Sequence, residues 1–343
     1  MHELLNTLYV QTQGAVLHLA HDTVSITVER ETRLRLPLIR LSSIVVFGRI
    51  TITPFLIQRC AEDGRSLVWL DRNGRFKARV EGPTRGNVLL RRAQHLALSD
   101  TKRTLNIARQ IVAAKIQNSR QIILRSARET SAEPVRAALT QAAERMAQIV
   151  GQLATYRTLD ELRGAEGDAA RTYFGVFGYH VRADQDKFTM DGRTRRPPRD
   201  RVNAVLSFLY ALLRAECTAG LESVGLDPQV GFLHALRPGR PALALDLMEE
   251  FRPLIADRLA LTLINRKQLQ PEHFADLPGG AIHLNDDGRK IVLQAYQLRK
   301  EEEVQHRMLD QKLPLGLVPY IQARLLARYL RGDLDAYPPY LAR

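Results

Sequence analysis

The segment LHALRPGRPALALDLMEEFRP, residues 233–253, places a histidine upstream of three acidic residues in an otherwise apolar run. His234 precedes a turn rich in Arg, Pro and Gly, and Asp246, Glu249 and Glu250 interrupt the apolar residues that follow. A buried carboxylate without a partner is costly, so these acids either face solvent on an amphipathic helix or share a cation. From spacing alone, a solvated helix face is the more common explanation of this pattern.

The alternative is a metal site built from this segment. On a helix, Asp246 and Glu249 are three residues apart and share a face, whereas Glu250 is turned by about 100° from Glu249. The intervening turn can fold His234 back over the start of that helix. One imidazole with two or three carboxylates is a mixed nitrogen and oxygen donor set, which suits Mg²⁺ or Mn²⁺ better than structural Zn²⁺.

A further acidic residue lies in LDELRGAEGDAARTYFGVF, residues 159–177. Glu166 has small neighbours, Ala165 and Gly167, which allow another element or a ligand to approach closely. At helical spacing Glu166 lies near the face that carries the following apolar residues, so it requires a partner, either an arginine or a metal ion. Tyr173, on the same segment, is either a core tyrosine, which is the more common case, or a residue that stacks on a base or orients a phosphate.

A basic segment, DQDKFTMDGRTRRPPRDR, spans residues 184–201 and contains Arg193, Arg195, Arg196 and Arg199. Its two adjacent prolines prevent a helix from entering it. The strongly apolar helical pattern VNAVLSFLYALL follows directly. The segment is either a loop that contacts DNA phosphates or a solvated flexible loop.

The composition favours a nucleic-acid partner. The 343 residues carry a formal net charge of +13 with a pI near 10.1, and the basic excess is mostly arginine, whose planar fork suits phosphate. The alternative explanation of the arginine excess is codon usage in a GC-rich genome.

Cys60 and Cys217 form neither a zinc cluster nor a disulfide framework, which favours a reducing cytoplasm. We expect neither a signal peptide nor a membrane span.

The hydrophobic periodicity predicts two domains. Short alternating segments with Gly and Asn-Gly turns predict a small N-terminal β-sandwich over residues 1–80, interrupted by one helix near 53–64. Residues 81–90 are the predicted linker. Apolar residues three and four apart then predict a larger all-α catalytic domain over 91–343, with Asp100 and Ser131 as helix caps and one short hairpin near 271–285.

Four segments, GAEGDAARTYF, RTRRPPRDRVNAVLSFLYALL, VGLDPQVGFLH and RPALALDLMEEFRPLIADR, occur in this order. Together they resemble the CRISPR-associated integrase, the nuclease of CRISPR adaptation, and the N-terminal segment MHELLNTLYVQTQGAVLHLAHDTVSI is similar to its I-C branch. The resemblance covers nearly the whole chain. It implies three metal ligands, Glu166 in the GxEGxxA motif, His234 in GFLH and Glu249 in DLxE. It also implies that Asp246 is an acid close to the metal and that Asn203 supports the site.

The resemblance implies a complete activity. Family members form homodimers through the N-terminal β-domain, and two dimers flank a dimer of a small ferredoxin-like partner in a heterohexamer. This assembly joins the 3′-hydroxyl ends of short double-stranded protospacer DNA to the CRISPR repeat by transesterification that depends on Mg²⁺ or Mn²⁺. An end-trimming nuclease is a further candidate partner. The candidate DNA-binding residues are Arg193, Arg195, Arg196, Arg199, Tyr173 and Asn203.

Three alternatives to this activity remain at this level. The chain is a metal-dependent nuclease of branched DNA without integration, a catalytically silent nucleic-acid scaffold, or a helical regulator whose charge reflects codon usage. The one departure from the motifs is Arg201, at a position where similar sequences often have proline, and it concerns only the conformation of the basic loop.

Overall fold

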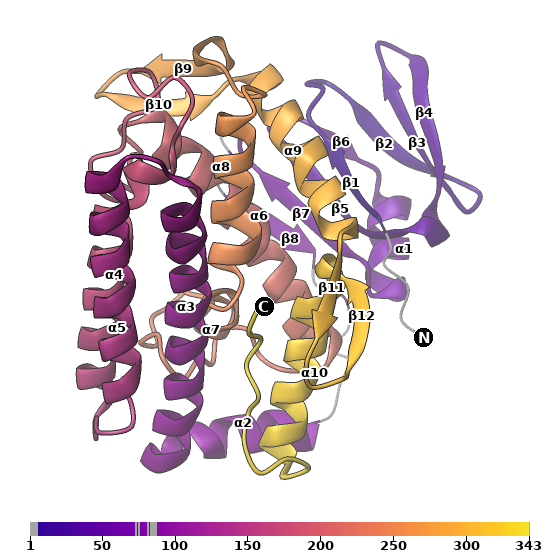
Figure 1. Ribbon diagram of the computed structural model, residues 1–343. Coiled ribbons are helices and arrows are strands. Elements are labelled where there is room, and N and C mark those ends of the chain that lie inside the picture. Colours follow the sequence, from indigo (N-terminus) through magenta and orange to yellow (C-terminus); the bar gives the residue numbers. More distant parts are fainter. Residues whose placement is uncertain (1–5, 73, 75, 81, 83–87, 343) are drawn as a thin grey trace. The chain divides into compact units, whose positions relative to one another are not determined.

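The computed structural model describes residues 6–72, 74, 76–80, 82 and 88–342, and the chain divides into two compact units, Met1–Gly86 and Asn87–Arg343. The first unit is rich in strands and the second is mainly helical (Figure 1). Helix α2 begins at Val88, inside the 81–90 segment that the sequence assigns to a linker. Most of the rest of that segment lies outside the described residues.

Within the described part of the first unit, two four-stranded sheets face a shared core. In the first sheet, with order β1-β5-β7-β8, β1 and β7 run parallel to β5, and β8 is antiparallel to β7. In the second, with order β4-β3-β2-β6, the β2–β3 and β3–β4 pairs are antiparallel. The strands are β1(Asn6–Val10), β2(Val16–Ala20), β3(Thr23–Val28), β4(Glu31–Pro37), β5(Leu41–Phe47), β6(Thr51–Ile52), β7(Ser66–Leu70) and β8(Phe76–Val80).

Helix α1(Pro54–Asp63) completes the core of the first unit. Pro54 occupies the first turn, where a missing N–H costs nothing, and Gly64 ends the helix in the left-handed region at φ 70°. Leu56 and Cys60 of α1 are fully buried in the cluster that both sheets share. The predicted β-sandwich with one inserted helix is therefore confirmed. The sequence did not predict β6 or β8, which are short or largely exposed.

The second unit is built from helices whose ends follow from local sequence. Asp100 caps α3 by accepting from the Arg103 N–H at 3.1 Å, as predicted. Thr158 and Glu161 form a reciprocal capping box on α5. The prediction of Ser131 as a cap is wrong, because α4 begins one residue later with Ala132 at the cap position. The helices are α2(Val88–Ser99), α3(Thr101–Glu129), α4(Glu133–Gln152), α5(Leu159–Gly175), α6(Arg201–Ser223), α7(Ala242–Met248), α8(Arg258–Asn265), α9(Asp286–Glu301) and α10(Val318–Arg331).

Helix α3 packs against both α5 and α7, and this packing brings the segments that contain Glu166 and Glu249 close together. Helices α3, α4 and α5 pack side by side, and α6 packs against α7, α8 and α10 (Figure 1).

Helix α6 is the one described helix long and apolar enough to cross a membrane by length and composition, but 56% of its apolar window is buried inside the unit. That burial is typical of a core helix.

Two hairpins interrupt the helical pattern of the described residues in this unit. The predicted one is formed by β9(Phe274–Leu277) and β10(Ala281–Leu284), with Gly279 and Gly280 at positive φ in its turn. The Ile282 N–H of this hairpin donates to the Pro198 carbonyl in the basic loop at 2.9 Å. The second hairpin, β11(Glu303–His306) with β12(Gln311–Pro314), was not predicted.

Candidate metal and DNA site

Glu166 enters the site from the middle of α5. Ala165 and Ala169 on the same helix are buried, and their small side chains permit the close packing of α5 against α3. The Glu166 side chain is 27% exposed and forms an ion pair with Lys115 of α3 through Oε1. The partner that the sequence required for this glutamate is therefore a lysine in the described structure.

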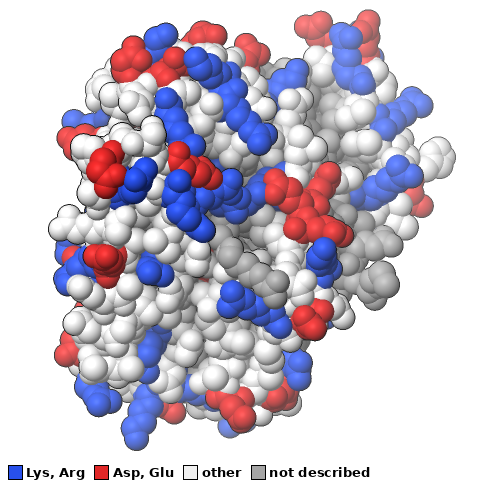
Figure 2. Space-filling view, viewed as in Figure 1, with Lys and Arg blue, Asp and Glu red and all other residues white. Residues whose placement is uncertain are grey.

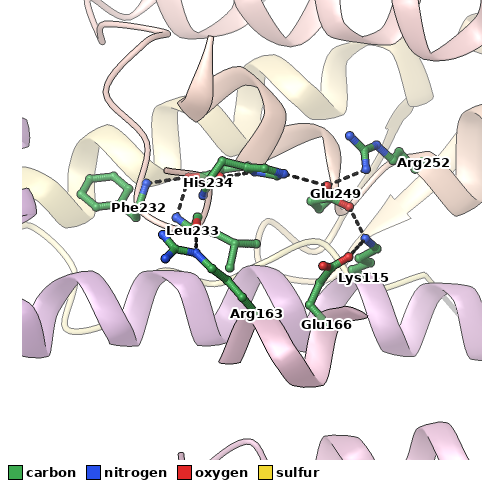
Figure 3. Close-up of polar contacts among 9 residues, drawn as sticks. Lys115, Arg163, Glu166, Phe232, Leu233, His234, Glu249 and Arg252 are labelled. Atoms are coloured by element: carbon green, nitrogen blue, oxygen red, sulfur yellow. Dashed lines mark hydrogen bonds and ion pairs between the residues drawn. The ribbon is translucent and has the colours of Figure 1, made fainter. Parts of the chain in front are cut away.

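His234 lies at the end of a loop that is fastened to the start of α7. A Cβ added at Gly231 would lie 2.6 Å from the Ala242 carbonyl carbon and 2.8 Å from Asp246 Oδ2, so only glycine fits there. The Asp246 carboxylate accepts the backbone N–H groups of Phe232, Leu233 and His234 at 2.6, 3.0 and 2.9 Å. Arg163 of α5 donates to the Leu233 carbonyl at 2.7 Å, which ties the same loop to α5 (Figure 3).

The same aspartate fixes the imidazole of His234. Asp246 Oδ1 lies 2.7 Å from His234 Nδ1, and because an ionised carboxylate can only accept, the neutral ring carries its hydrogen on Nδ1. The lone pair of Nε2 then points towards Glu249, whose Oε1 is 3.6 Å away (Figure 3). A carboxylate behind a histidine is the arrangement that orients metal-binding imidazoles. Asp246 is therefore an orienting group here, turned towards the loop.

Among the three candidate ligands, Glu166, His234 and Glu249, Glu249 is the most buried, at 1% exposure. Lys115 Nζ lies 2.8 Å from its Oε2, and Arg252 Nη1 lies 2.6 Å from its Oε1. Burial alone would raise the pKa of Glu249, but the charges of Arg252 and Lys115 lower the pKa to about 2. The carboxylate is consequently ionised at neutral pH.

Glu250 faces the other way. Its carboxylate accepts from the Tyr337 hydroxyl, from the Tyr340 N–H at 2.7 Å and from Gln322 Nε2 at 3.1 Å. Burial raises the pKa of Glu250 to about 7, and these hydrogen bonds offset that only in part. The expectation that Glu250 points away from Glu249 agrees with this geometry, since Glu250 anchors the C-terminal tail.

Glu166, His234 and Glu249 thus converge from α5, the loop before α7 and the end of α7. Within the described residues no three His, Cys, Asp or Glu side chains are spaced to hold one metal ion directly, and the Lys115 ammonium lies between Glu166 and Glu249. The donor set of one imidazole nitrogen and carboxylate oxygens nevertheless fits a divalent cation that prefers oxygen, such as Mg²⁺ or Mn²⁺.

Sequence reasoning missed both cations beside these acids. Lys115 lies in AAKIQNS, inside a helix whose neighbours Ala114 and Ile116 are fully buried. A lysine at a buried position requires a carboxylate partner. An apolar helical segment that contains a lysine could therefore have indicated that Lys115 pairs with an acid. Arg252 begins a π-helical turn, Arg252–Asp257, which the helical periodicity of ALALDLMEEF did not indicate.

Tyr173 is a core residue. It is 3% exposed, and its hydroxyl donates to Asp257 at 2.9 Å, while the Tyr210 hydroxyl donates to the same carboxyl at 2.8 Å. Burial raises the pKa of Asp257 to about 6. The guanidinium groups of Arg193 and Arg252 lie over the Tyr210 ring, 5.2 and 5.1 Å from its centroid. Because its ring is enclosed, Tyr173 cannot stack on a base in this conformation, and its predicted role as a DNA contact is not supported.

The comparisons with known proteins decide the family. The sequence profile described as "CRISPR associated protein Cas1" matches residues 8–298, most of the chain. A CRISPR-associated endonuclease Cas1 from Moorella thermoacetica (strain ATCC 39073 / JCM 9320) is 56% identical over 343 residues, with 100% of each chain covered.

This chain belongs to the Cas1 family. The predicted family is thereby confirmed, whereas the I-C-like branch stays a prediction.

Solved structures show the same fold as this Cas1 chain. A casposase bound to an integration product superposes with a TM-score of 0.82 at 23% identity, covering 97% of this chain and 93% of the casposase. A Cas6-RT-Cas1--Cas2 complex gives a TM-score of 0.82 at 22% identity, covering 99% of this chain and 37% of the other. At these identities the likeness concerns the fold. The strand-rich unit followed by a helical unit is thus the architecture of Cas1 structures.

The basic loop of this Cas1 chain contains two kinds of arginine, one that is hydrogen-bonded within the loop and others that are exposed. Arg193 donates to the Thr194 carbonyl, to Asn203 Oδ1 at 2.6 Å and to Ser207 Oγ at 3.1 Å, so its guanidinium organises the loop. Asn203 is fully buried and donates to the Gly192 carbonyl at 2.9 Å, which makes it a structural support with no exposed surface for DNA.

The other candidate arginines are exposed: Arg195, Arg196 and Arg199. Lys and Arg side chains gather above the centre of the view in Figure 2, over the helical unit. This positive surface agrees with the net charge of +13 and suits a phosphate backbone.

Proposed function

We propose that this chain is a divalent-metal-dependent DNA integrase and endonuclease. In this proposal it joins the 3′-hydroxyl ends of short protospacer DNA to the CRISPR repeat by transesterification during CRISPR adaptation. The observation that carries the proposal is the convergence of three side chains from separate segments: Lys115 pairs with both Glu166 and Glu249, and His234 Nε2 lies 3.6 Å from Glu249 Oε1. Family membership and a relative named as an endonuclease support it.

The chain's own residues prepare this site for phosphodiester chemistry. A divalent ion held by Glu166, His234 and Glu249 would neutralise phosphate charge and lower the pKa of a bound hydroxyl. Asp246 keeps Nε2 of His234 available, and Arg252 keeps Glu249 ionised. No covalent enzyme intermediate is needed, so the protein contributes positioning and charge stabilisation.

The basic loop supplies the second part of the proposal. Arg195, Arg196 and Arg199 hold backbone phosphates on either side of the reacting bond, while Arg193 and Asn203 keep the loop in place. Contacts of this kind carry no sequence information but fix the register of the duplex. Assembly follows the family expectation of a homodimer through the N-terminal unit and a small ferredoxin-like partner. The Cas6-RT-Cas1--Cas2 complex, in which a chain of the same fold is assembled with Cas2, supports such a partner.

A strand-joining assay tests the proposal. A short duplex with free 3′-hydroxyl ends is mixed with a repeat-containing plasmid, in Mg²⁺ or Mn²⁺, with and without the small partner. His234→Ala and Glu166→Gln should abolish joining while DNA binding survives. Matched controls are His95→Ala on α2 and Glu144→Gln on α4, both exposed and remote from the site in sequence.

The outcomes separate the alternatives. Cation-dependent cutting of branched DNA without joined product would favour a nuclease that does not integrate. DNA binding that needs no divalent cation, with no reaction in either metal, would favour a scaffold. Full joining by either ligand variant would refute the assignment of the site.

A further inference from the structure

Lys115 stands out among the groups around the site because no motif includes it. Its side chain is 11% exposed and projects from α3 between α5 and the end of α7. The ammonium pairs with Glu166 Oε1 and lies 2.8 Å from Glu249 Oε2 (Figure 3). A single buried lysine thus bridges the two carboxylates that the proposed function assigns to the metal.

The bridge has an electrostatic reason. Two carboxylates in one poorly solvated site repel each other strongly unless a positive charge lies between them. Of these two acids, Arg252 contacts only Glu249, through Oε1. Among the described residues, Lys115 is the cation that contacts both acids. Lys115 therefore holds Glu166 and Glu249 together in the metal-free chain.

The bridge and a bound divalent ion exclude each other. A lysine nitrogen requires about 2.8 Å to a carboxylate oxygen, whereas Mg²⁺ requires about 2.1 Å to the same oxygen. Lys115 contacts Glu249 through Oε2 and His234 faces the same carboxylate through Oε1, so an ion held by Glu166, His234 and Glu249 would lie within a few ångströms of the ammonium, where like charges repel. One of them must leave for the other to bind.

We infer that Lys115 is an internal competitor for the metal ion, which preserves the ligand geometry in the metal-free protein and is displaced on loading. The inference rests on the proposed metal site and adds a residue that sets its affinity. Lys115 also lines a small cavity together with Ser119, Tyr210 and Arg195.

The test measures metal affinity directly. Chelator-treated protein is titrated with Mn²⁺ and free Mn²⁺ is followed by electron paramagnetic resonance, for the wild type, Lys115→Met and Lys115→Gln. Both variants should bind Mn²⁺ at least about tenfold more tightly than the wild type. Both should also unfold at a lower temperature without metal, and their gain in unfolding temperature on adding Mn²⁺ should be larger.

The control is a second buried lysine in the same unit. Lys300 is 4% exposed and pairs with Glu216, away from the three ligands. Lys300→Met should lower the unfolding temperature but leave the Mn²⁺ affinity unchanged. This control separates competition for the metal from a general loss of packing.

Failure of the inference can be told from failure of the proposed function. If Mn²⁺ binds the wild type and no longer binds Glu166→Gln, but Lys115→Met binds no more tightly, the competitor role is wrong while the metal site stands. If Mn²⁺ binding to the wild type is insensitive to Glu166→Gln and His234→Ala, the metal site itself is wrong and the competitor role falls with it.

Discussion

Glu249 and Glu250 are adjacent in the chain, yet their carboxylates face opposite surroundings. Glu249 lies between Lys115 and Arg252, and its pKa is lowered to about 2. Glu250 accepts hydrogen bonds from the C-terminal tail, and burial raises its pKa to about 7. One residue supplies a permanent charge to the candidate site, and its neighbour anchors the last segment of the described chain behind that site.

Asp246→Asn tests the orientation of His234. An asparagine amide facing Nδ1 favours the tautomer with hydrogen on Nε2, which removes the lone pair aimed at the metal position. We expect Mn²⁺ affinity to fall by about 10–100-fold, the range typical when the partner behind a metal-binding histidine is removed. Calorimetric titration measures it, and circular dichroism checks that the fold survives. Unchanged affinity in a folded variant would show that Asp246 does not orient the imidazole.

Gly231→Ala tests the close approach of the histidine loop to α7. The added methyl would overlap the Ala242 backbone and Asp246 Oδ2, so we expect a loss of about 1–3 kcal/mol in stability and weaker metal binding. The matched control is Gly164→Ala on α5, where a Cβ meets no atom within 4 Å. That change should stabilise by about 0.5–1 kcal/mol. Urea unfolding of both variants gives the comparison, and equal stabilities would contradict it.

The exposed arginines should govern the salt dependence of DNA binding. Changing Arg195, Arg196 and Arg199 together to Gln should weaken binding, and the slope of log affinity against log salt should fall by roughly 1 for each phosphate that the variant no longer neutralises. The unfolding temperature should not change. Arg193→Gln should instead lower the unfolding temperature, because Arg193 holds the loop. Fluorescence anisotropy at several salt concentrations makes the measurement; an unchanged slope in the triple variant would exclude this loop as the DNA contact.

His180 predicts an acid-sensitive stability. Within the described structure both of its ring nitrogens are buried without a hydrogen-bond partner, and burial lowers the pKa of His180 to about 4. An unfolded histidine titrates near a pH of about 6.5, so the unfolded chain binds more protons between these values. This contribution to stability is complete above about pH 6.5 and is lost as the pH falls towards about 4.

His180→Phe should remove that loss, since phenylalanine keeps a ring against Phe177 and cannot be protonated. We compare the free energy of unfolding of the variant with that of the wild type at two pH values. Lowering the pH from about 7.5 to about 5 should shift this difference by about 2 kcal/mol in favour of the variant. Thermal unfolding at several pH values measures this. Parallel stability curves for the two proteins would mean that His180 does not titrate as its burial indicates.

Tyr337→Phe tests the anchor of the C-terminal tail. Removing the hydroxyl that donates to Glu250 should cost about 1–2 kcal/mol, because a buried acceptor loses a partner. Tyr179→Phe is the control, since Tyr179 is 48% exposed and its change should cost little. Chemical denaturation measures both. A similar small effect in the two variants would count against the tail as a stabilising contact.

The sequence predicted most of the architecture because apolar residues repeat every two residues in strands and every three to four residues in helices, and both repeats are strong local signals. The Asp100 cap was predictable for the same reason. Ser131 failed because α4 begins at Glu133 followed by a proline, and that proline sets the helix start without a side-chain cap. The π-helical turn at Arg252–Asp257 has no periodic signature and could not be predicted.

The candidate ligands could be named from motifs in the sequence, but the charged residues around them could not. Glu166, His234 and Glu249 lie in motifs, and the structure brings them together. Lys115 and Arg252 act through space, from positions where the sequence shows only a charge within a helical pattern. Tyr173 and Asn203 were candidates for DNA contact by motif, but burial assigns them to the interior. The side chains that a fold buries cannot be read from a motif.

The hydrogen bond from Ile282 to the Pro198 carbonyl has a consequence for how this protein diverges from its relatives. The reach of the arginine-bearing loop is set partly by a hairpin that lies far along the chain from it, and substitutions in that hairpin can tilt the loop without altering any arginine. In the proposed function, such substitutions would change which DNA the loop contacts, while Glu166, His234 and Glu249 stay the same.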